Sequence, residues 1–370
     1  MCIIEELKKA GSVVNHEGYY YRLSNIIEIL ILGLMCQMKT LTEIHMWATS
    51  KHVNPMLQEN FGIIKIPCYS HFAGLVGLID SEKLNKIFMD FFSKLVETVV
   101  GKTIAIDGKT ICTTANMKKF ESPLNIASAF VVENGITIGQ LAADSKSNEI
   151  PIVRELIRLL NVEGATIVAD ALHCQEETAK EILNAGADYV LSVKKNQANL
   201  YEDIKEMIDF KQGDLCESNC TPLEKATKTE KGHGRIDKRT AVVTHETEWL
   251  EERSKFENIQ TIGAIISETE TRYYMSSKVL TAIELLTITR QEWAVESMHW
   301  QLDVIFGEDF TTLHERNAQI TMNILRKSVL NVIRVYRDKY EPKSNMINIS
   351  RKCLLDVDFL LEFLEKFGEC

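Results

Sequence analysis

The sequence changes character at about residue 101, and this change limits the possible folds more than any other feature. Residues 1–100 carry apolar side chains at helical spacing, as in residues 23–34 and 84–95. Between residues 102 and 194, short apolar segments rich in β-branched residues alternate with helical segments, in the order three strands, helix, strand, helix, strand. An antiparallel hairpin followed by strand–helix alternation predicts an α/β fold in which helices flank a mixed sheet.

The elements predicted for this central region have clear limits. The turn residues Glu133-Asn134-Gly135 separate the second strand from the third and predict a hairpin. The strands are expected at residues 102–111, 125–132, 137–142, 165–170 and 189–194. The helices are expected at residues 149–160, 175–185 and 197–208.

Residues 210–280 interrupt the alternation and are predicted to form a β-rich insertion, with strands at 239–244, 261–266 and 273–276 after a polar, basic stretch. Residues 281–284 have the spacing of a helix capping box, and helix is expected from there to about residue 305, with a break, and again over 316–340. We therefore divide the chain into five parts. They are a helical domain at 1–100, the first part of the core at 101–209, the insertion at 210–280, a helical second part of the core at 281–345, and a helical tail at 346–370.

Cysteine usage and the apolar runs predict a cytoplasmic protein. The nine cysteines are odd in number and scattered, which is typical of free thiols in a reducing compartment. The N-terminus lacks the features of a signal peptide. The most apolar run, residues 26–38, is too short to span a bilayer and contains Glu28, so we expect a buried helix and no association with a membrane.

The formal charge of −10 argues against a nucleic-acid partner, because Lys and Arg usually drive phosphate binding. The charge is unevenly distributed, however. Residues 225–239 carry six Lys and Arg against two acids, and residues 326–352 carry eight against two. Each stretch is either a footprint for an acidic partner or a solvated basic face.

Two aspartates are associated with strands of the predicted sheet. Asp107 lies within an apolar strand and Asp170 ends another. Binding sites in such sheets gather at the carboxyl ends of parallel strands, where two neighbouring carboxylates can converge on one cation. The alternative is that both aspartates begin polar loops and cap a turn or the following helix.

Carboxylates are oxygen ligands, which favour magnesium or manganese over zinc, and a carboxylate pair of this kind suits phosphoryl transfer. A third carboxylate would complete the site. Residue type alone leaves several candidates open: Asp144, Glu149, Glu292, Glu296, Asp303, Glu308 and Asp309.

A series of motifs spans nearly the whole chain. They are IAIDGKT at 104–110, DSKSNEIP at 144–151, IVADALHCQ at 167–175, DYVLSVKKNQ at 188–197, KGHGRID at 231–237, YYMSS at 273–277 and EWAVESMHWQLDVIFGED at 292–309. In this order they resemble insertion-sequence transposases of the H-repeat-associated group, within the DDE transposases that have a ribonuclease-H-like core. Several ordered motifs are far more specific than any single one.

The resemblance implies a ribonuclease-H-like mixed sheet, a helical N-terminal domain, and a β-rich insertion before the last catalytic helix. It implies that Asp107, Asp170 and Glu296 are the catalytic, metal-binding residues. The implied cofactor is Mg²⁺, with Mn²⁺ as an alternative, and two ions are expected in each site.

The implied activity is DNA cleavage at the ends of an insertion sequence and transfer of the freed strand to target DNA. The implied partners are double-stranded DNA, namely the element's terminal repeats and the target, and a second copy of the chain in a homodimer on paired ends. The helical domain at 1–100 would serve DNA-end binding or dimerisation, and the protein would associate with the bacterial nucleoid. Candidate DNA contacts are Lys109, Lys194, Lys195, Arg235, Arg290 and Trp300.

Two positions depart from the family's pattern. Related transposases often have a lysine where this chain has Asp303, and a histidine where it has Glu292. The three acids are nevertheless all present. A domesticated or inactive transposase that binds DNA without cutting it stays open as the alternative. A sugar or acetate kinase, suggested by residues 107–110 (DGKT), is disfavoured because the chain lacks a second glycine-rich nucleotide loop.

Overall fold

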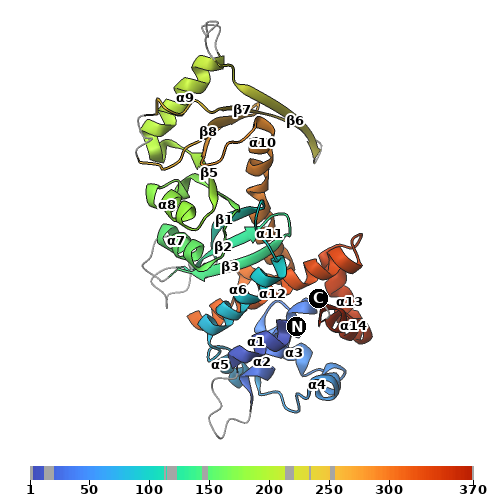
Figure 1. Ribbon diagram of the computed structural model, residues 1–370. Coiled ribbons are helices and arrows are strands. Elements are labelled where there is room, and N and C mark those ends of the chain that lie inside the picture. Colours follow the sequence, from blue (N-terminus) through green and yellow to red (C-terminus); the bar gives the residue numbers. More distant parts are fainter. Residues whose placement is uncertain are drawn as a thin grey trace.

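Figure 1 shows the computed structural model of the chain. The structure describes residues 3–11, 21–111, 114, 123–143, 149–212, 221–232, 235–250 and 255–368, without the side chains of residues 231–236.

Helices dominate the described part of the first hundred residues, as expected. The helices are α1 (Ile3–Lys8), α2 (Leu23–Met35), α3 (Leu41–Ala48), α4 (Val53–Phe61), α5 (Tyr69–Val76) and α6 (Ser81–Val96), with a short 3-10 turn, η1 (Lys9–Gly11), after α1. Helix α2 contains residues 26–35 of the most apolar run, and it is buried along almost its whole length. This confirms the predicted buried helix. Within the residues described, no helix is long and apolar enough to cross a membrane.

The central sheet contains the five strands expected between residues 102 and 194. Its strands are β1 (Thr103–Thr110), β2 (Asn125–Val131), β3 (Ile136–Ala142), β4 (Thr166–Ala169) and β5 (Asp188–Val193), arranged side by side as β3-β2-β1-β4-β5. The pairs β1/β2 and β2/β3 are antiparallel, and the pairs β1/β4 and β4/β5 are parallel. The predicted mixed sheet is therefore confirmed, because a meander precedes two strand–helix crossovers.

Four more strands extend this sheet to nine: β6 (Glu224–Gly232), β7 (Arg235–Thr244), β8 (Thr261–Ile266) and β9 (Thr271–Ser276). They are antiparallel to one another, and β9 pairs with β5. The β-rich insertion thus continues the core sheet (Figure 1). The basic stretch at 225–239 forms the hairpin of β6 and β7; polar residues fill β6, so no apolar alternation marked that strand in the sequence. The five-part division of the chain remains a prediction.

Helices cover both faces of the sheet. They are α7 (Glu149–Leu159), α8 (Glu176–Asn184), α9 (Ala198–Gln212), α10 (Ala282–Gln291), α11 (Trp293–Phe306), α12 (Arg316–Tyr340), α13 (Met346–Leu355) and α14 (Val357–Gly368), and short 3-10 turns lie at η3 (Ala171–His173), η4 (Lys195–Gln197) and η6 (Glu308–Phe310). Helix α12 contacts β3 as well as α2 and α6, and so joins the sheet to the N-terminal helices (Figure 1). Helix α11 packs on β1.

The helix expected from residue 281 begins with the predicted capping box, formed by Thr281 and Glu284. The predicted break separates α10 from α11 and lies at Glu292.

Candidate active site

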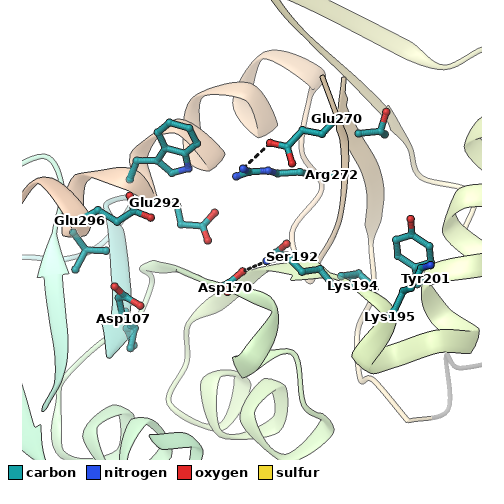
Figure 2. A pocket seen from close by; sticks show the side chains of 15 residues that line it. Asp107, Asp170, Ser192, Lys194, Lys195, Tyr201, Glu270, Arg272, Glu292 and Glu296 are labelled. Carbon is teal, nitrogen blue, oxygen red and sulfur yellow. Dashed lines mark hydrogen bonds and ion pairs between the residues drawn. The ribbon is translucent and has the colours of Figure 1, made fainter. Parts of the chain in front are cut away.

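An open cavity of about 630 Å³ lies at the carboxyl ends of β1, β4 and β5. The three predicted acids Asp107, Asp170 and Glu296 all line it, and Glu292 is a fourth carboxylate on its wall (Figure 2). The strand register explains why the two aspartates meet there. Ile106 pairs with Ala169 in the parallel β1/β4 ladder, so the next residue on each strand, Asp107 and Asp170, occupies the matching position.

Asp107 is the more enclosed of the two aspartates. Burial, together with the charge of Glu149, raises the pKa of Asp107 to about 6. The Nδ1 atom of His299, from α11, lies 3.5 Å from Asp107 Oδ2. Burial and the charges of Lys327 and Lys109 lower the pKa of His299 to about 3, so this imidazole is neutral at physiological pH. A neutral ring can position the Asp107 carboxylate but does not neutralise it.

Asp170 follows β4 directly and lies closer to solvent. Its Oδ1 atom accepts a hydrogen bond from Lys194 Nζ at 3.0 Å, and both side chains are more than half exposed. Burial alone would raise the pKa of Asp170, but hydrogen bonds from Lys194 and from the backbone N–H of Ala171 lower it. Asp170 is therefore ionised across the physiological range.

Glu292 and Glu296 come from the junction of α10 and α11. Burial and the charge of Asp170 raise the pKa of Glu292 to about 7. Glu296 is exposed at its position one turn further along α11. Glu292, noted in the sequence as a departure from the family's motif, is thus an additional acid in the cavity.

The acids of the cavity fit a hard divalent cation in their chemistry. They offer oxygen ligands alone, and burial and mutual repulsion disfavour the charges on Asp107 and Glu292. Among the residues described, however, no group of three or more His, Cys, Asp and Glu side chains is gathered tightly enough to form a metal cluster. The three predicted acids share one cavity without converging on a single point.

The candidate DNA contacts are only partly brought together. Lys194 and Lys195 line the cavity. Lys109 Nζ instead lies 2.5 Å from Asp303 and 2.9 Å from Glu308, and its side chain is 13% exposed. Trp300 is 62% exposed, outside the cavity lining. The backbone of Arg235 begins β7, and its side chain is outside the described residues, as is Asp144.

Arg290 belongs to a cluster that sequence analysis missed. Three guanidinium groups surround the indole of Trp293, with the Cζ atoms of Arg239, Arg272 and Arg290 at 4.8, 5.5 and 4.9 Å from a ring centroid. Each arginine also pairs with an acid, as Arg272 does with Glu270 at 2.6 Å (Figure 2). Arg272 and Trp293 line the cavity. These arginines come from β7, β9 and α10, and nothing in the local sequence links them.

Comparison with known proteins places the chain in a family. Residues 100–332 match the family model of the transposase DDE domain. The protein YncI of Escherichia coli O157:H7, named as a candidate transposase, is 33% identical over 82% of this chain and 79% of its own length. YhhI of E. coli strain K12, named as an H repeat-associated candidate transposase, is 29% identical over 82% of each chain.

Among solved structures, the chain resembles a piggyBac transposase in a synaptic complex with hairpin DNA. The alignment covers 100% of this chain and 79% of the piggyBac chain, at 11% identity and a TM-score of 0.49. This likeness is too weak to bear on function. The family model and the relatives lead to one assignment: the chain belongs to the DDE transposases, in the H-repeat-associated group.

Proposed function

We propose that the protein is a metal-dependent DNA nuclease and strand transferase that moves an insertion sequence. One observation supports this above all others. Asp107 and Asp170 occupy matching positions on adjacent parallel strands, and both line one cavity with Glu296. Carboxylates that share one cavity are the type of protein ligand that two-ion phosphoryl transfer uses.

In this proposal Asp107, Asp170 and Glu296 would hold two divalent ions, Mg²⁺ or Mn²⁺. Bound ions would lower the pKa of the attacking water or hydroxyl and stabilise the leaving oxygen. His299, held neutral by burial and by nearby lysines, orients Asp107. Lys194 stabilises the ionised form of Asp170 until the ions bind.

The proposed reaction has two chemically matched steps. Water attacks a phosphodiester at the element's end, the bond from phosphorus to the 3′-oxygen breaks, and the oxygen leaves as a free 3′-hydroxyl. That hydroxyl then attacks a phosphodiester of target DNA in line, so that one bond to phosphorus forms as another breaks. Because each step displaces an oxygen at phosphorus, one site serves both.

Positive side chains at the cavity would guide the DNA. Lys195 and Arg272 line the cavity beside the acids, and Arg239 and Arg290 lie against the Trp293 ring. Each of the three arginines is paired with an acid, which DNA phosphates would replace. On a chain with a net charge of −10, such a local patch is needed to bring phosphates to carboxylates. The patch supports double-stranded DNA as the partner.

The remaining partners follow from the family. We propose a homodimer on paired element ends, with the helices of residues 1–100 binding the ends or forming the dimer interface. We also propose a location in the bacterial cytoplasm, at the nucleoid. The described thiols of Cys36, Cys68, Cys174 and Cys353 are free, as a reducing compartment requires.

The test is incubation of the purified protein with DNA carrying the element's ends, with Mg²⁺, with Mn²⁺ and with a chelator. Nicking that needs the metal and disappears in Asp107→Asn, Asp170→Asn and Glu296→Gln is the expected result. Glu206→Gln, an exposed change on α9, is the matched control and keeps activity. Retention of DNA without nicking under every condition would favour the inactive, DNA-binding alternative. Nicking that survives in all three variants would refute the mechanism.

A further inference from the structure

A fifth carboxylate, that of Glu149, reaches the strand that carries Asp107. Glu149 begins α7, and its carboxyl group lies against Gly108. A Cβ atom at residue 108 would stand 2.1 Å from Glu149 Cδ and 2.3 and 2.4 Å from its oxygens, which no side chain tolerates. Only a glycine at residue 108 therefore admits this carboxylate in its present place.

His173 holds the same carboxylate from the other strand. Its Nε2 atom lies 3.0 Å from Glu149 Oε1, and the His173 side chain is 2% exposed. His173 closes the short turn that follows Asp170, so Glu149 connects the residue after Asp107 with the turn after Asp170. The position of Glu149 is thus tied to both predicted metal-binding aspartates.

The end of β1 is open enough for groups from both faces of the sheet to meet there. Asp107 is directly opposite Ser128 in the β1/β2 ladder, so the two side chains lie on the same face of the sheet. Ser128 accepts a hydrogen bond from Lys327 on α12, so this is the face covered by α11 and α12. Gly108 faces the opposite side, toward α7. The ladder with β4 ends at Ile106, so residues 107–110 form no ladder pairs with β4. Glu149 and Asp107 can therefore approach the same point around this end of β1.

The contact with His173 holds Glu149 in place, but it does not account for the effect of Glu149 on Asp107. Glu149 is partly exposed, and among charged groups it acts most strongly on Asp107, as described above. Packing one carboxylate beside another is unfavourable unless a cation joins them. We infer that Glu149 is a further carboxylate of the proposed cation site, held in place by His173 and by the space at Gly108. This inference rests on the proposed function.

The experiment is titration of the full-length protein with Mn²⁺, with binding read from the loss of the free-ion electron paramagnetic resonance signal. We expect Glu149→Gln to weaken Mn²⁺ binding about tenfold or more, as loss of a group at a metal site typically does. Its melting temperature without metal should match the wild type, since an amide keeps the shape and the hydrogen bond. Glu155→Gln, an exposed change on the same helix, is the control and should bind like the wild type.

Gly108→Ala gives a second route to the same answer if Glu149→Gln does not fold, because the added methyl group displaces the carboxylate without removing it. It should weaken Mn²⁺ binding as well. Wild-type affinity in both variants would overturn the role of Glu149. If Asp107→Asn loses Mn²⁺ binding in that case, the proposed function stands and only this inference fails. A wild-type protein that binds no Mn²⁺ at millimolar concentration would overturn both.

Discussion

Lys109 and Asp303 form an ion pair of 2.5 Å that joins β1, two residues beyond Asp107, to α11, two turns beyond Glu296. Lys109 also contacts Glu308 at 2.9 Å, and Glu308 is 1% exposed and accepts a hydrogen bond from Asn323 of α12. The acid at residue 303 thus has a partner inside the protein, where related transposases often have a lysine. The ion pair links the two elements that present Asp107 and Glu296 to the cavity.

Replacing Lys109 tests this link. Lys109→Met should lower the free energy of unfolding by about 3 kcal/mol, because it leaves the buried Glu308 carboxylate without its cation. Urea unfolding measures the loss. The control is Lys205→Met, which breaks an exposed pair with Asp209 and should cost no more than about 0.5 kcal/mol. Equal, small losses in both variants would mean that the link contributes little.

The two tryptophans of α11 should differ sharply in stability effect. Trp293→Ala removes a ring contacted by three guanidinium groups, and should destabilise the protein by about 2 kcal/mol. Trp300 is 62% exposed, so Trp300→Ala should stay within about 0.5 kcal/mol of the wild type. Thermal or urea unfolding decides. A stable Trp300→Ala variant that binds DNA more weakly would also support the predicted DNA contact of Trp300.

Lys195 should act on DNA through charge alone. Lys195→Ala should weaken binding of all DNA sequences alike and reduce the slope of log affinity against log salt by about one. Binding is measured by fluorescence anisotropy at several salt concentrations. Lys180→Ala, which removes an exposed lysine of α8 outside the cavity, should leave the slope unchanged. An equal reduction of the salt slope in Lys195→Ala and Lys180→Ala would contradict a specific role for the cavity in DNA binding.

Lys327 should make stability depend on pH in the alkaline range. Burial lowers the pKa of Lys327 to about 8, below its ordinary value of 10.5. The unfolded chain therefore binds more protons between these two values, and the unfavourable charge in the folded state is lost as the pH rises through about 8. Lys327→Met should gain most stability relative to the wild type below pH 8, and the gain should shrink toward pH 10.

Urea unfolding of both proteins at pH 7.5 and 10 measures this change. Lys86→Met, at an exposed position on α6, is the control and should show no such trend. If the difference in unfolding free energy between Lys327→Met and the wild type is the same at both pH values, Lys327 is charged in the folded protein at pH 7.5 and at pH 10.

Much of the fold was predictable because its signals are local. The spacing of apolar residues marked α2, α6 and α12, and the strand–helix order from residue 102 marked the mixed sheet. Strand β6 was missed, because a hairpin strand filled with Lys, Thr and Glu carries no alternation of apolar and polar residues. Strand β6 is held in its extended conformation by hydrogen bonds to β7, which its own sequence does not indicate.

The sequence by itself determined the family and the mixed sheet, and it predicted Asp107, Asp170 and Glu296 as the catalytic acids, since each depends on residues close together or on ordered motifs. Only the tertiary structure decided that Lys109 meets Asp303, that three arginines gather on Trp293, and that Glu149 reaches Gly108. These contacts join residues far apart in the chain. Their partners are set by strand register and helix packing, which no local pattern records.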